Sequence, residues 1–484
     1  MVIRLVSLAL LSAVLALGRP DPLEAAPPKT AREQELEERI RRLERIIEER
    51  GLDRPVPAAK PTDEAAVPVP KEEVEALIDD KLKKQKVLAG WKDGFFLESP
   101  NGDFKLKFRG LVQANARFPF GAGTNPTNSQ FFLRRVRPTF EGTVFKYFDW
   151  KIMPDFGLGT TTLQDAYMDI NYFGPEVKLR AGKTKVPFSL ERLQSAQNLL
   201  FIERAISQNL APNRDVGFYL FGDLLDSIVG YQAGVFNGEQ DGGSVDGDVN
   251  DGKELAARLF GFPFKETDLP YLQGLGVGLA GTYGADDGGN DVTNTNYRTS
   301  ERVSFFRYRS PSNTTVTAQG NRNRVSPQGY YFWGPFGLQG EYIRSKVGVQ
   351  WEGNTSGAIT QREFDNEGWF VQASYVLTGE DATYGTLVPI NNFDPRNGRW
   401  GAFEVALRGS KVSIDQDAFT SGFADPDAFP SKTSEITAGV NWYLNKNFKF
   451  QLNYSNTEFD RRIEINDELF SGVNSFQMQF QISY

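Results

Sequence analysis

The last stretch of the chain, residues 473–484, constrains the fold more than any other. It reads VNSFQMQFQISY, in which large apolar side chains alternate strictly with polar, uncharged ones. A period of two residues is that of a β-strand with one apolar and one polar face. A soluble sheet can alternate in this way, but a terminal strand with so aromatic a face favours the closing strand of an outer-membrane barrel. Even-numbered residues would then face lipid, and odd-numbered residues a water-filled lumen.

Composition is consistent with a barrel and excludes other classes of protein. Hydrophobic residues make up 40% of the 484 residues and the mean hydropathy is -0.42, which excludes a bundle of membrane helices. Aromatic residues reach 13%, as expected where only alternate residues of each strand meet lipid. The formal net charge of -8 argues against nucleic acid as the main partner.

Two residue types are missing from the whole chain. Without Cys the protein has no disulfide, no thiol nucleophile and no thiolate metal site. Without His it has no Ser–His triad, no His general base and no His-ligated zinc or haem. Catalysis by a carboxylate pair is open in principle, but the chain offers no nucleophile with its base. We therefore predict no enzyme activity, no metal and no cofactor.

The N-terminus has the pattern of a secretory signal peptide over residues 1–18. Arg4 supplies a positive charge, and the apolar run that follows, residues 5–17, is too short to cross a bilayer comfortably. Ala16-Leu17-Gly18 is a plausible cleavage site of small residues. The alternative is a short membrane anchor.

Residues 19–90 predict a periplasmic linker. Within residues 32–50, apolar residues recur at spacings of four, three and four residues, which is the a/d pattern of a coiled coil. This pattern predicts a short coiled coil, and a single solvated charged helix is the alternative. A second short helix is expected over residues 71–86. The apolar residues of the a/d pattern are Leu36, Ile40, Leu43 and Ile47.

From residue 91 onward, strands and turns repeat, which predicts an outer-membrane barrel over 91–484. Short turns alternate with long loops rich in Gly, Asn, Asp and Ser, as short periplasmic turns and long extracellular loops do in such barrels. We predict an all-β transmembrane barrel of about 16 antiparallel strands, wide enough for an aqueous channel. The strands are expected to start near residues 104, 130, 148, 163, 177, 213, 226, 252, 272, 324, 337, 366, 399, 433, 448 and 473.

Because lipid-facing residues must be apolar, the charged residues of each strand are expected to face the lumen. In the strand from residue 130, Arg135 and Arg137 alternate with apolar residues. A lumen rich in cations would favour anions electrostatically. The alternative is that each cation pairs with a nearby carboxylate. The candidate pore-lining cations on strands are Arg109, Arg135, Arg137, Lys151 and Arg180.

Residues 183–214 break the alternation. This stretch is too long for a tight turn and too apolar for an exposed loop, so we predict that it folds into the barrel and narrows it. Irregular backbone is tolerated at membrane depth where it lines water. The alternatives are a loop that caps the barrel or packs on a neighbouring subunit. The candidate cations at this constriction are Lys183, Lys185, Arg192, Arg204 and Arg214.

Several blocks of sequence resemble the phosphate-selective porin O and P family. GKTKVPFSLERLQSAQNLLFIERAI followed by LAPNRDVGFYLFG looks like the third-loop region of that family, and RRVRPTFEGTVFKYFDWKIMPDFG and TLQDAYMDINY are similar to other blocks. The resemblance runs from about residue 104 to residue 484. It implies a homotrimer of roughly 16-stranded barrels, in which the inward loop forms the constriction. It also implies a ladder of lumen arginines, including Arg135, Arg137 and Arg180, that leads phosphate towards that loop.

These features together predict a passive outer-membrane channel for small anions. Phosphate or polyphosphate is the anion that the resemblance implies. The expected partners are small inorganic anions, the lipid of the outer membrane and further copies of the chain, with no nucleic acid. Two alternatives stay open. One is a general porin without anion preference, and the other is a structural protein that uses the barrel to anchor a periplasmic tether.

Overall fold

The structure, a computed structural model, describes residues 87–120, 128–244, 246–248, 251–291, 296–310, 316–352, 359–465 and 468–484. The predicted signal peptide, coiled coil and second helix lie outside these residues, so they stay predictions. Among the described residues, no helix is long and apolar enough to cross a membrane.

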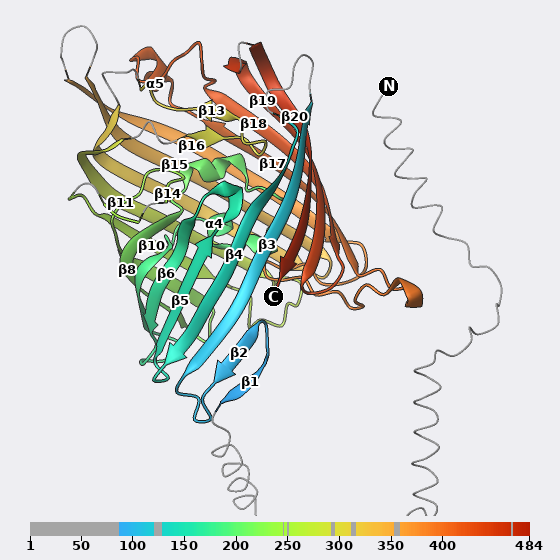
Figure 1. Cartoon of the computed structure of the whole chain (residues 1–484). Coiled ribbons are helices and arrows are strands. Elements are labelled where there is room, and N and C mark those ends of the chain that lie inside the picture. The colour runs from blue at the N-terminus through green and yellow to red at the C-terminus, as the bar shows by residue number, and fades with distance from the viewer. Residues whose placement is uncertain are drawn as a thin grey trace, which may run out of the picture. The chain divides into compact units, whose positions relative to one another are not determined.

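Sixteen antiparallel strands of the described chain close into a barrel, which confirms the predicted fold class (Figure 1). Each strand pairs with its neighbours in chain order, and the last strand pairs with the first barrel strand to close the sheet. The barrel strands are β3 (Lys105–Phe120), β4 (Gln130–Val144), β5 (Phe148–Asp155), β6 (Thr162–Ile170), β7 (Lys178–Lys185), β8 (Arg214–Leu224), β9 (Val229–Phe236), β10 (Glu254–Gly261), β11 (Leu275–Asp291), β14 (Thr317–Trp333), β15 (Phe336–Glu352), β16 (Ile359–Val376), β17 (Ala402–Ser413), β18 (Lys432–Tyr443), β19 (Phe448–Ile465) and β20 (Glu468–Ser483).

Three strands begin earlier than the sequence pattern predicts. β14 begins at residue 317 rather than 324, β16 at 359 rather than 366, and β20 at 468 rather than 473. All three extensions lie at the barrel end that carries the long loops. Their sequences are mostly polar on both faces, so they carry no apolar alternation by which a lipid-facing strand is recognised.

The remaining elements are short. A hairpin of β1 and β2 pairs with β3 ahead of the barrel, and β1 spans the predicted boundary between linker and barrel at residue 90. The short elements are β1 (Leu88–Trp91), β2 (Phe95–Glu98), η1 (Gly157–Gly159), α4 (Leu190–Leu193), η2 (Ala196–Asn198), η3 (Ile206–Leu210), β12 (Tyr297–Arg298), β13 (Ser304–Phe306), η5 (Pro395–Asn397) and α5 (Gln416–Thr420).

The third loop, residues 186–213 between β7 and β8, folds into the barrel as predicted, and Figure 1 shows α4 within the lumen. Phe188, Leu190 and Leu210 of this loop are fully buried. Phe188 and Leu210 belong to a hydrophobic core that lies inside the barrel and includes Phe364 of the wall. The apolar residues that made this loop unsuitable for solvent are therefore the residues that fix it in the lumen.

A second segment also enters the barrel, contrary to the sequence-based expectation. Residues 285–322 are predicted as one long external loop, but β11 and β14 extend into that range. Residues 296–310 between them pack inward. Phe305 and Phe306 of this segment are buried in the same core as the third loop. The third loop is therefore not the only segment that narrows the lumen.

The connection 377–401 between β16 and β17 is long, although it lies at the same barrel end as short turns such as 145–147 and 334–335. Its Tyr384 hydroxyl donates to the carbonyl oxygen of Leu190 at 2.6 Å. In return, the Gln194 side-chain amide donates to the Tyr384 carbonyl oxygen at 2.9 Å. The third loop is thus held from the short-turn end as well as by the wall.

Amide side chains of the wall hold the irregular backbone of the third loop. The Asn441 amide donates to the Leu200 carbonyl oxygen at 3.0 Å, and the Gln481 amide donates to that of Gln197 at 3.0 Å. Asn453 accepts a hydrogen bond from the Ile202 N–H at 2.8 Å. A loop at membrane depth needs such partners because unpaired backbone groups are costly when buried.

Candidate anion site in the barrel

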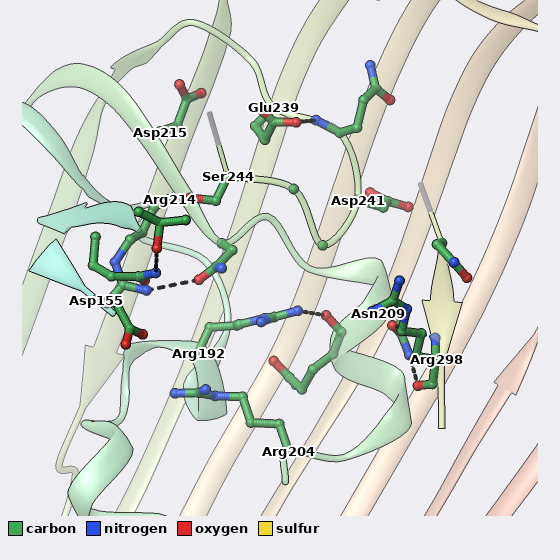
Figure 2. Close-up of a pocket in the computed structure, with 18 of the residues that line it drawn as sticks. Asp155, Arg192, Arg204, Asn209, Arg214, Asp215, Glu239, Asp241, Ser244 and Arg298 are labelled. Carbon is green, nitrogen blue, oxygen red and sulfur yellow. Dashed lines mark hydrogen bonds between the residues drawn. The ribbon is translucent and has the colours of Figure 1, made fainter. Parts of the chain in front are cut away.

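A cavity of ≈ 1010 Å³ lies inside the barrel beside the third loop (Figure 2). Its lining comes from β4, β8, the third loop and residues of the segments 155–164, 237–244, 247–248 and 296–302. Six carboxylates share the lining with eight arginines, so positive charges exceed negative ones by two among the described residues. The arginines are Arg134, Arg135, Arg137, Arg192, Arg204, Arg214, Arg298 and Arg302.

Three of these arginines are neutralised by carboxylates. Arg134 pairs with Glu203 at 2.5 Å, Arg137 with Asp155 at 2.7 Å, and Arg214 with Asp165 at 2.8 Å. A paired guanidinium contributes little net field, and its geometry serves mainly to brace the wall.

Within the described chain, no group of three or more acidic side chains is placed to hold a metal ion.

The other five arginines have no carboxylate within 4.0 Å in the part of the chain that the structure describes. Arg192 donates to the Gln208 carbonyl oxygen at 2.5 Å, and Arg204 donates to the carbonyl oxygens of Glu191 at 3.0 Å and Gln194 at 3.1 Å. Backbone carbonyls orient these guanidinium groups without cancelling their charge. The five arginines are Arg135, Arg192, Arg204, Arg298 and Arg302.

The start of α4 fixes the position of Arg192. Ser189 caps the helix, since its hydroxyl oxygen accepts from the Arg192 N–H at 3.2 Å. The Glu341 carboxylate, from β15, accepts from the Leu190 N–H at 3.1 Å and from the Ser189 hydroxyl at 2.9 Å. A carboxylate at a helix N-terminus is electrostatically favourable. The wall therefore sets where this arginine enters the cavity.

Of the ten cations predicted as pore-lining, five line the cavity: Arg135, Arg137, Arg192, Arg204 and Arg214. The other five lie elsewhere. Arg109 pairs with Glu141 at 2.5 Å, Lys151 with Asp165 at 2.9 Å, Arg180 with Asp169 at 2.6 Å, and Lys183 with Asp246. Lys185 is half-buried and donates to the carbonyl oxygens of Leu193 at 3.1 Å and Gln194 at 2.9 Å. Six of the ten cations thus have carboxylate partners, which is the alternative left open by the sequence.

Sequence reasoning missed three arginines of the cavity. Strict alternation places Arg134 on the lipid face, but β4 has a bulge here: Gln113 pairs with Arg135 and Ala114 pairs with Leu133. The bulge lets Arg134 reach Glu203 inside the barrel. Arg298 and Arg302 lie on the 296–310 segment, whose aromatic residues carry the same signal that identified the third loop.

Two carboxyl groups on inward loops have pKa values near neutral pH. Burial, with a smaller contribution from Asp215, raises the pKa of Glu239 in the cavity lining to about 7. Burial, followed by the charge of Glu435, raises the pKa of Glu301 to about 7. These two groups change charge within the physiological range.

Comparisons with known proteins agree with the geometry of a porin. The model of a family described as phosphate-selective porin O and P matches residues 104–484. Porin O of Pseudomonas aeruginosa is 24% identical over 402 residues, which cover 76% of this chain and 86% of that protein. Among solved structures, the outer-membrane channel DcaP of Acinetobacter baumannii matches at a TM-score of 0.49 and 11% identity, over 82% of this chain and 100% of that one. An anion-selective porin from Comamonas acidovorans matches at 0.47 and 11%, over 79% and 100%.

Proposed function

Because the chain belongs to the phosphate-selective porin O and P family, and is therefore a non-enzymatic porin of the outer membrane, we propose that it prefers small anions and binds phosphate in the arginine-lined cavity. The observation that carries this proposal is the set of five cavity arginines without a carboxylate partner in the described chain. Planar guanidinium groups can donate two parallel hydrogen bonds to a phosphate.

Transport through such a site is passive and follows the concentration gradient. A pore site must attract an ion strongly enough for entry and release it fast enough for conduction. Arg192 and Arg204 suit both demands, since their carbonyl partners keep them oriented after an ion has left. The six carboxylates in the lining limit the excess positive charge and so favour release.

The experiment is block of chloride current by phosphate in a planar bilayer containing the purified full-length protein. We expect phosphate to block the wild-type channel, and the double variant Arg192→Gln/Arg204→Gln to need about a tenfold higher concentration, the factor that ~1.4 kcal/mol produces. The control is Arg344→Gln, which removes the same charge from an exposed arginine paired with Asp365. Equal block in the double variant and the control would refute a phosphate site at these arginines.

Two further parts of the account stay predictions: the homotrimer, and the periplasmic position of the N-terminal extension. Cross-linking of the protein in outer-membrane vesicles would test the first. Labelling of residues 19–90 from the periplasmic side would test the second. Neither result bears on the cavity itself.

A further inference from the structure

The cavity has an acidic side that a site for inorganic phosphate does not need. Among its described carboxylates, Asp215 and Glu239 have no Lys or Arg within 4.0 Å, whereas Asp155, Glu203 and Asp241 are each paired with an arginine. In Figure 2, Asp215 and Glu239 lie along the opposite side of the view from Arg192 and Arg204. The cavity therefore carries uncompensated charges of both signs.

The carboxylate of Glu239 is held in position by its surroundings. One of its oxygens accepts from the Gln240 N–H at 2.9 Å. A Cβ atom at Gly243 would lie 2.2 Å from the same oxygen, so a larger residue at position 243 would require the Glu239 side chain to move. The neighbouring Asp215 is anchored as well, because it accepts from the Gly238 N–H at 2.7 Å.

A second observation points to a ligand in this space. The side-chain amide nitrogen of Gln240 lines the cavity and has no hydrogen-bond partner among the described residues, although Gln240 is only 8% exposed. Arg135, at 2% exposed, likewise keeps its Nε without a partner in the described chain. Buried donors of this kind are normally satisfied, so a bound group with acceptor atoms would complete the site.

We propose that the cavity selects small phosphates or phosphonates that also carry an ammonium group. The anionic end would lie against Arg192 and Arg204, and the ammonium group against Glu239 and Asp215. Five uncompensated arginines against two uncompensated carboxylates match a ligand whose negative charge exceeds its positive charge. This inference rests on the proposed function, since it assigns a substrate class to the same site.

The test compares 2-aminoethylphosphonate with ethylphosphonate as blockers of chloride current in the full-length channel, at about pH 8, where Glu239 is mostly ionised. We expect the amino compound to block the wild-type channel at about tenfold lower concentration, the factor for ~1.4 kcal/mol. In Glu239→Gln, the amino compound should block less strongly. Ethylphosphonate and phosphate should block more strongly, because a repelling charge is gone. The control, Glu363→Gln, removes a carboxylate that is exposed and paired with Lys346, and should keep the wild-type ratio.

Equal block by the two phosphonates in the wild-type channel would overturn the inference, and so would a ratio that survives Glu239→Gln. Block by phosphate in either case would leave the proposed function standing. Failure of phosphate and both phosphonates to block would remove the proposed function together with the inference.

Discussion

The charge of an arginine in this lumen depends on what its guanidinium group contacts. Arg134 and Arg192 line the same cavity, but Arg134 is neutralised by Glu203 whereas Arg192 contacts a carbonyl oxygen. At low effective dielectric, an adjacent carboxylate cancels most of the field of a cation. The partners of the arginines, rather than their number, set the potential that an anion meets.

This dependence predicts that removing a carboxylate strengthens block by phosphate, whereas removing arginines weakens it. Glu203→Gln removes the partner of Arg134, so the excess of positive charge in the cavity rises by one and phosphate should block at lower concentration. We expect a change of about threefold to tenfold, as for one partly screened charge contact. Titration of the chloride current with phosphate measures the concentration needed for block. Weaker block in this variant than in wild type would contradict the role given to the pairing.

Half of the predicted site residues lie in the cavity, and the reason is local. Strand alternation decides only which face a side chain takes, so it places Arg137 and Arg180 equally well in the lumen. It does not reveal that Arg180 lies 3.7 Å from the ring of Tyr167 and pairs with Asp169. It also fails at the bulge, where Arg134 reaches the lumen. Ion pairs between strands depend on register, which one sequence does not determine.

At the scale of elements, the inward loops are fixed by apolar contacts and by amide side chains of the wall. The polar face of β20 consists of the uncharged residues that alternate with large apolar ones in the sequence. It includes Gln481, which donates a hydrogen bond to the third-loop backbone. On β18, a Cβ atom at Gly439 would lie 3.1 Å from the ring of Phe201, so glycine leaves space for the loop. The third loop was predictable because its apolar residues exclude it from solvent. The 296–310 segment was not recognised because its apolar residues sit within a longer polar stretch.

The 296–310 segment should loosen as pH rises. Glu301 is buried and accepts from the hydroxyls of Thr457 at 3.1 Å and Ser475 at 3.3 Å. The Thr457 hydroxyl also lies 3.2 Å from Glu435, which Arg408 approaches to 3.4 Å. Arg117 is a further cation that interacts with Glu301. The pKa of Glu301 is raised from 4.5 to about 7. Because the inward state binds the proton more tightly, its stability is complete below pH 4.5 and falls as the pH rises to about 7.

Cleavage by trypsin at the arginines of this segment measures the effect. We expect the ratio of the wild-type cleavage rate to that of Glu301→Gln to increase from about pH 6 to about pH 8, since only the wild type gains the charge. Using the ratio removes the pH dependence of trypsin itself. A ratio that stays constant across this range would show that Glu301 does not control the segment.

For the whole molecule, the number and order of the barrel strands were predictable because lipid imposes a rule on every strand, whereas three strand starts lay five to seven residues from their predicted positions. The outward face must be apolar and every backbone group must be paired, so the alternation is repeated sixteen times in the described chain. Such a rule does not apply to the loops inside the lumen, which meet water, charges and one another. The net charge of the chain, -8, is likewise no guide to the cavity, where arginines exceed carboxylates.

The most direct test of this account is the reversal potential of the purified protein in a planar bilayer under a gradient of potassium chloride. The account predicts a potential shifted towards the equilibrium value of chloride, because the uncompensated arginines of the cavity raise the local concentration of anions. A potential near zero, or one shifted towards the equilibrium value of potassium, would contradict the account. The channel would then be a general porin, and the cavity arginines would serve only to hold the loops.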